Sequence, residues 1–60
     1  MVVKFNDKTD NKYLEVEKHN DTVSFFIAEF GEEQIGQFIE IPMAEIQNLI
    51  KHLQSIQLYQ

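Results

Sequence analysis

The amino-acid sequence predicts a small α+β domain: an antiparallel four-stranded meander with one C-terminal helix packed on one face of the sheet (ββββα), as a single domain over residues 1–60. Two patterns carry this prediction. Apolar and polar residues alternate through much of the chain before Pro42, which is typical of half-buried strands. From Pro42 onward the apolar residues recur at the i, i+3, i+4, i+7 spacing of a helix. The short polar connections favour sequential hairpins.

The first two strands are expected over residues 1–5 and 12–18. The first is rich in β-favouring residues, with two valines and a phenylalanine. Residues 6–11 between the strands are polar and rich in Asn and Asp, which favours a loop. In the second strand Leu14 and Val16 alternate with polar or amphipathic neighbours, so one of its faces is expected to be buried.

The third and fourth strands are expected over residues 23–30 and 34–41. The third is β-branched and aromatic over most of its length. Asn20 and Asp21 precede it and tolerate the positive φ of a hairpin turn. Residues 31–33, which begin with Gly31, are expected to form the next turn.

A helix is expected over residues 42–58, with fraying over residues 58–60. Pro42 suits the first helical position, where its missing N–H is not needed. Glu45 lies favourably near the positive end of the helix dipole. The apolar residues form one stripe, which has to be buried against the sheet. That stripe is Met43, Ile46, Leu49, Ile50, Leu53 and Ile56.

Alternation along the strands assigns the sheet residues to two faces. The larger aliphatic set is expected to face the helix and to form a single two-layer core. It comprises Phe5, Leu14, Val16, Val23, Phe25, Ile27, Ile35, Ile39 and Ile41. The other set, which we call the aromatic face, comprises Lys4, Tyr13, Glu15, Glu17, Ser24, Phe26, Ala28, Phe38 and Glu40, with Gly36 on the same side. Three of its aromatics lie on consecutive strands, and glutamates surround them, which is the general anatomy of a protein interface.

Charge and composition exclude several classes of function. Five lysines and no arginine stand against ten acidic residues, which gives a net charge of −5 and argues against direct nucleic-acid binding. The chain has no cysteine, so neither disulfides nor a thiolate zinc site is expected. It shows no apolar run of signal-peptide or membrane-spanning length, so no membrane association and a cytoplasmic location are expected.

The sequence offers no recognisable catalytic or metal-binding constellation. Ser24 and Ser55 lie in regular elements, and nothing in the sequence brings His19 and His52 together. The alternating polar residues Asp7, Thr9, Asn11 and Glu15 fail the calcium-loop signature at its third, sixth and twelfth positions. We therefore expect no catalytic residue, no cofactor and no metal, and we expect that the protein is not an enzyme.

The leading functional hypothesis is a non-enzymatic protein–protein interaction module. A chain of 60 residues without disulfides or a structural metal has little core, so self-association is expected. A homodimer would form through the aromatic face, with interface residues Tyr13, Glu15, Glu17, Phe26, Ala28, Phe38 and Glu40.

An alternative hypothesis is a small acidic inhibitor or adaptor that docks on a basic site of a partner protein, such as a site that normally binds nucleic acid. A third is the addition of a partner's strand to an edge of the sheet. The usage of Lys, Asn, Ile and Gln, without Arg or Trp, suggests an AT-rich bacterial or phage source.

Overall fold

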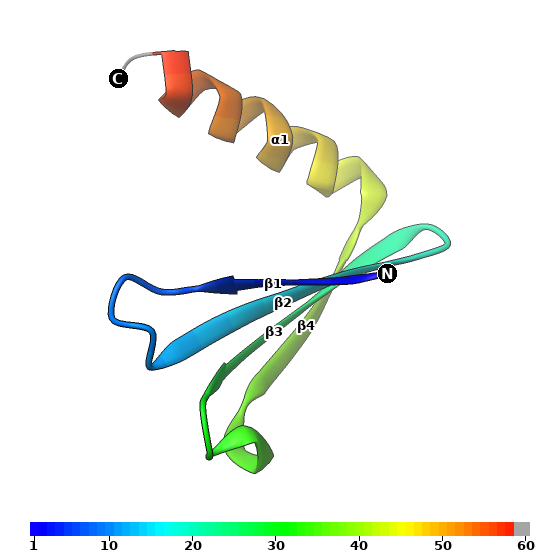
Figure 1. Ribbon diagram of the computed structural model, residues 1–60. Coiled ribbons are helices and arrows are strands. Elements are labelled where there is room, and N and C mark those ends of the chain that lie inside the picture. Colours follow the sequence, from blue (N-terminus) through cyan, green and yellow to red (C-terminus); the bar gives the residue numbers. More distant parts are fainter. Residues whose placement is uncertain (59–60) are drawn as a thin grey trace.

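The computed structural model describes residues 1–58 and shows one open sheet followed by one helix (Figure 1). The strands are β1 (Val2–Asn6), β2 (Lys12–His19), β3 (Thr22–Glu29) and β4 (Gln37–Pro42), and the helix is α1 (Met43–Leu58). The sheet order is β1-β2-β3-β4, and every neighbouring pair is antiparallel. The predicted ββββα fold class is thereby confirmed. The fraying expected at the chain end falls largely on residues 59 and 60, which lie outside the described residues.

Eight of the ten predicted element boundaries differ from the structure, seven of them by one residue and the start of the fourth strand by three. The fourth strand begins at Gln37 because Glu33–Ile35 form the single 3₁₀ turn η1, in which the Ile35 N–H donates to the Glu32 carbonyl (3.1 Å). Pro42 ends β4 and does not begin α1. It stands at the end of an edge strand, which is where a sheet tolerates a residue without an N–H.

The register of the sheet confirms the expected division into two faces. Across β2 and β3, Tyr13 lies opposite Ala28 and Leu14 lies opposite Ile27, and Phe26 faces Phe38 on β4. Ile35 is the exception, because it belongs to η1 and is largely exposed. The face on the side of α1, called the helix-side face below, consists of Val3, Phe5, Leu14, Val16, Val23, Phe25, Ile27, Ile39 and Ile41.

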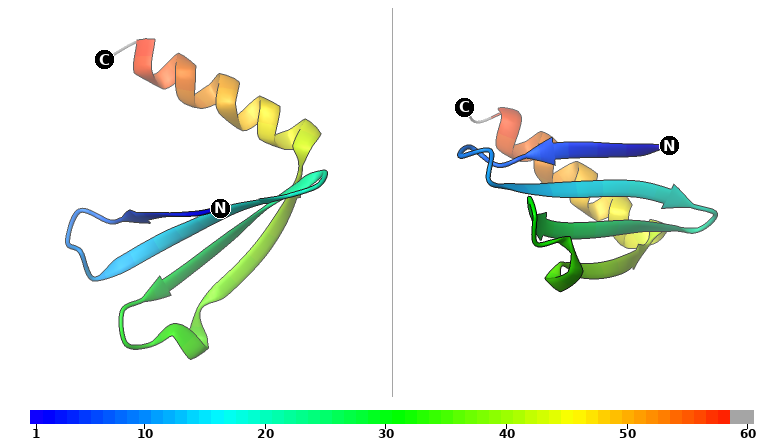
Figure 2. Two further views of the ribbon diagram at one scale, coloured as in Figure 1. Left: turned by 45° about the vertical axis from the view of Figure 1, so that its right-hand side comes forward. Right: turned by 60° about the horizontal axis from the view of Figure 1, so that its bottom comes forward.

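The helix leaves the sheet at a steep angle (Figures 1 and 2). Within residues 1–58, α1 approaches β3 and β4 and does not approach β1 or β2. Near the start of α1, Ile46 is 7% exposed, and Val23 on the helix-side face of β3 is 8% exposed. Further along the helix, Leu49, Ile50, Leu53 and Ile56 are exposed, and we call these four residues the helix stripe.

The expectation of one two-layer core that buries the whole aliphatic set is therefore wrong. On the sheet, Phe5, Ile27 and Ile39 are each more than half exposed. The physical reason is the connection: Met43 follows Pro42 directly, without the two to six loop residues that usually let a helix fold back onto its sheet. The backbone N–H of Met43 also donates to the carbonyl of Asp21 (2.8 Å), which ties the start of α1 to the β2–β3 turn.

Candidate interaction surfaces

The aromatic face contains a packed cluster centred on Tyr13. The Tyr13 ring meets Phe26 edge-on, with centroids 6.3 Å apart, and Phe30 in a tilted arrangement at 4.7 Å. The Lys4 ammonium lies 4.5 Å from the centroid of the Tyr13 ring, a cation–π contact. Tyr13 is only 5% exposed as a result.

Tyr13, Phe26 and Lys4 lie on this face as predicted, whereas Phe30 is a member of the cluster that was not predicted. The Phe30 N–H donates to the Asn11 carbonyl (3.0 Å), which extends the β2–β3 pairing by one step beyond the end of β3. Alternation from Phe26 through Ala28 to position 30 could have identified it. The signal was present in the sequence.

The remaining predicted interface residues differ in their exposure. Ala28 is buried beside Tyr13, and Phe26, Glu15 and Glu17 are half-buried, whereas Phe38 (62% exposed) and Glu40 are open to solvent. Phe38 is thus the aromatic side chain of this face that is most available to a second molecule. A role for the face in binding stays a prediction.

Gly36 is covered by an aromatic ring, as its placement on this side of the sheet suggests. A Cβ atom at this position would come within 2.5 Å of the Phe26 ring and 2.9 Å of the Ile27 carbonyl oxygen. Only glycine leaves room for the ring to lie against the backbone here.

Burial raises the pKa of the Tyr13 hydroxyl above its ordinary value of 10.0, and the nearby carboxylates of Glu33 and Glu15 raise it further. The neutral phenol is therefore favoured in the folded state. Tyr13 contributes to stability fully below pH 10.0, and this contribution is lost as the pH rises through the folded-state pKa.

We expect the Tyr13 phenol of the folded protein to titrate above pH 10.0, and to return to the ordinary value in denaturant. Tyr59→Phe removes the other tyrosine of the chain, so that the ultraviolet absorbance of tyrosinate reports on Tyr13 alone. Equal midpoints in native and denatured protein would contradict the packing of Tyr13.

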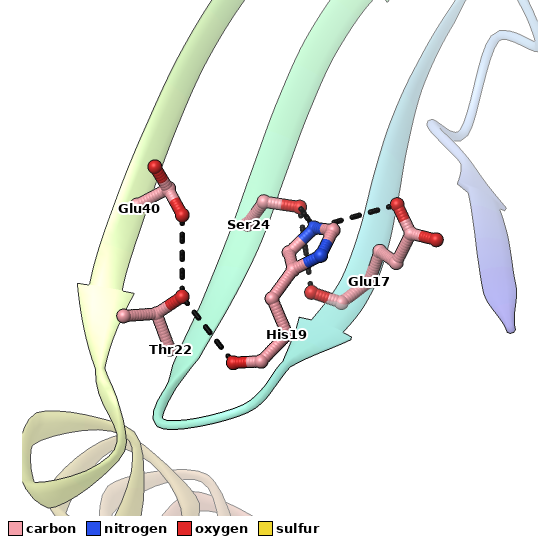
Figure 3. Close-up of polar contacts among 5 residues, drawn as sticks. All are labelled: Glu17, His19, Thr22, Ser24 and Glu40. Carbon is pink, nitrogen blue, oxygen red and sulfur yellow. Dashed lines mark hydrogen bonds and ion pairs between the residues drawn. The ribbon is translucent and has the colours of Figure 1, made fainter.

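A polar cluster lies on the same face at the β2–β3 hairpin (Figure 3). Nε2 of His19 lies 3.1 Å from the Ser24 hydroxyl and 3.4 Å from Oε1 of Glu17. The Ser24 hydroxyl lies 3.3 Å from the carbonyl oxygen of Glu17, to which it donates. Between β3 and β4, the Thr22 hydroxyl donates to Oε2 of Glu40 (3.2 Å).

Sequence reasoning missed this cluster, although the hairpin predicts it. The turn at Asn20 and Asp21 pairs His19 with Thr22 and Glu17 with Ser24, which places all four side chains on one face. Asn20 has the positive φ (34°) that the turn was expected to need.

The arrangement does not form a nucleophile–base–acid relay. In such a relay the serine and the carboxylate contact opposite nitrogens of the imidazole, whereas Ser24 and Glu17 both meet Nε2. Ser24 is also 6% exposed, with its proton directed at a backbone carbonyl. These contacts hold the hairpin together, and they give Ser24 no means of activation as a nucleophile.

The acidic loop that superficially resembles a calcium site is an internally bonded turn. The carboxylate of Asp7 accepts hydrogen bonds from the Thr9 hydroxyl (2.8 Å) and the Lys12 N–H (3.2 Å), and these bonds lower the pKa of Asp7. In the described part of the chain, no three His, Asp or Glu side chains gather in a metal-binding arrangement. Over the same residues, no helix has the length and apolar character to cross a membrane.

The helix-side face carries two adjacent apolar hollows. One, of ≈ 360 Å³, is lined by residues that include Phe5, Leu14 and Ile27. The other, of ≈ 300 Å³, is lined by residues that include Phe25, Ile27 and Ile39. The two hollows share Ile27, and Phe5, Leu14, Phe25, Ile27 and Ile39 in their lining were all expected in the core. The remaining lining residues are Asn6, Asp7, Lys12, Tyr13, Gln37 and Phe38.

No family model, curated protein sequence or solved structure matches this chain.

Proposed function

We propose that the chain is a non-enzymatic protein–protein interaction module that assembles as a homodimer. One observation carries the proposal: the single chain has almost no core. Its buried hydrophobic residues are Tyr13, Val23, Ala28 and Ile46, and no large side chain of the described residues is fully buried. A domain of this size without disulfides or metal needs either a well-packed core or a second subunit.

The dimensions of the chain support the same proposal. Its accessible surface is 5133 Å², whereas a compact monomer of 7.1 kDa exposes about 4,100 Å². Its radius of gyration is 13.0 Å, compared with about 10 Å for a compact domain of 60 residues. The excess surface of about 1,000 Å² is close to the roughly 800 Å² that each partner buries in a standard interface.

The aromatic face suits a different protein partner better than a second copy. Glu15, Glu17 and Glu40 outnumber Lys4 on it, so an isologous contact would bring like charges together. Of the acidic residues in the described part of the chain, only Glu17 has an ion-pair partner, His19. The remaining acidic side chains are therefore available to a basic protein surface. Their availability favours the acidic inhibitor or adaptor as the second candidate function, with Phe38 as the exposed anchor.

Sedimentation equilibrium over a hundredfold range of protein concentration tests the homodimer. We expect twice the mass of the chain, persisting to low micromolar concentration, because the excess surface matches a specific interface. A monomer at every concentration, with a melting temperature that does not depend on protein concentration, would overturn the proposal.

A further inference from the structure

Two apolar surfaces of the chain face the same open space and do not meet. One is the helix-side face, on which Phe5, Ile27 and Ile39 are more than half exposed. The other is the helix stripe, whose four residues range from 37% exposed at Leu49 to 54% at Leu53. The stripe continues the line of Ile46, which is buried against the sheet where the helix begins, so both surfaces lie on the inner side of the angle between α1 and the sheet (Figure 2).

The chain's own helix is not placed to close this angle. Its start is joined directly to β4 and is hydrogen-bonded to the β2–β3 turn through Met43 and Asp21. Contact with the sheet is limited to β3 and β4 within residues 1–58. The β1 and β2 part of the helix-side face therefore stays open.

A second copy of the chain offers the surface that fits. The α1 helix of 16 residues is about 24 Å long, which is enough to cross four strands spaced about 4.8 Å apart. Its leucine and isoleucine side chains match the apolar lining of the two hollows that share Ile27. Each chain presents both the helix stripe and the helix-side face. Two copies can therefore pair so that the helix of each chain covers the sheet of the other.

The distribution of charge favours self-association here over the aromatic face. The charged residues on the helix-side register are Lys12, Lys18 and Glu29, all near strand ends. The helix stripe carries no charge. Two chains of net charge −5 can thus meet through this face without placing glutamates against glutamates.

We propose that two chains exchange their helices, so that the helix stripe of each copy packs on the helix-side face of the other, around a twofold axis. This inference rests on the proposed function, because it names the surface through which the homodimer forms. Two equivalent helix-on-sheet contacts result, and together they complete the two-layer core that the single chain lacks.

Charge substitutions on the two surfaces test the exchange. Leu53→Glu and Ile27→Lys each place a charge in both contacts of a homodimer, and we expect each to weaken dimerisation by about a hundredfold or more. An equimolar mixture of the two variants should recover a heterodimer. One of its contacts joins glutamate to lysine, and the other is wild type on both sides.

The matched control carries the same two charges in a single chain. Leu53→Glu/Ile27→Lys mixed with wild type places one charge in each contact, and we expect no recovery of the heterodimer. Native mass spectrometry, with one chain labelled with nitrogen-15, distinguishes heterodimers from homodimers. The mixture is informative even where a single variant is unfolded, because the heterodimer forms on mixing. Ile39→Lys serves as a second variant of the sheet surface.

Recovery in the first mixture alone supports helix exchange. Equal recovery in both mixtures, or in neither, overturns it, since contacts of helix with helix and sheet with sheet cannot distinguish the two mixtures. A wild-type dimer that resists Leu53→Glu and Ile27→Lys but dissociates with Phe38→Glu overturns the exchange, leaves the homodimer standing and assigns it to the aromatic face. A monomeric wild type overturns both.

Discussion

Replacing Ile46 by alanine is expected to lower the free energy of unfolding by about 2–4 kcal/mol. Ile46 is 7% exposed and lies where α1 meets β3 and β4, the only part of the sheet that the helix approaches within residues 1–58. The helix approaches the sheet only at β3 and β4 within residues 1–58, so little else compensates for the loss of this buried side chain. Because a small domain has a thin margin of stability, a loss of this size leaves much of the population unfolded at moderate temperature.

The measurement is denaturant unfolding followed by circular dichroism, with all proteins at one fixed concentration because dimerisation would shift the midpoint. Gln47→Ala is the matched control, since it changes the next residue of the helix, which is exposed. If the free energies of unfolding of Ile46→Ala and Gln47→Ala differ by less than about 0.5 kcal/mol, Ile46 is not buried between helix and sheet as the structure shows.

Gly36→Ala is expected to destabilise the fold by about 1–3 kcal/mol, because the added Cβ would overpack the aromatic face. That atom would lie 2.5 Å from the Phe26 ring and 2.9 Å from the Ile27 carbonyl oxygen. The Phe26 ring also makes the edge-on contact with Tyr13, so a shift of the ring would disturb the aromatic cluster. The backbone at Gly36 is extended (φ −67°, ψ 165°), so the penalty comes from the contact and not from the φ angle.

Gly31 provides the opposite case. A Cβ atom there would meet no atom within 4 Å, but the residue has φ +86°, so a substitution costs backbone strain instead of packing. Gly31→Asn, which tolerates the left-handed region, is expected to cost less than about 1 kcal/mol. Near-ultraviolet circular dichroism should change for Gly36→Ala and stay the same for Gly31→Asn. Equal stabilities for the two variants would show that Phe26 does not cover Gly36.

Much of the candidate surface could be read from alternation along the strands. The β2–β3 turn sets the register, and the register places Tyr13, Phe26 and Glu15 on one face without any knowledge of packing. The same rule would have found Phe30 and the contact of His19 with Ser24, had it been carried through to the ends of the hairpin. The burial of Tyr13 could not be predicted from alternation, because it depends on the directions of the Lys4 and Phe30 side chains.

The order of the elements, the antiparallel meander and the two faces of the sheet could all be predicted from the amino-acid sequence. These follow from local chemistry: the period of the apolar residues, the turn at Asn20 and Asp21, and the change of period after Pro42. The angle between the helix and the sheet could not be predicted in this way, because it arises from tertiary contacts. That angle depends on the direction of the chain at the Pro42–Met43 junction and on the hydrogen bond from Met43 to Asp21, which no periodicity encodes. The same stripe of Leu49, Ile50, Leu53 and Ile56 can complete the core of its own chain or of a second one, and the geometry of the junction leaves it open to a second.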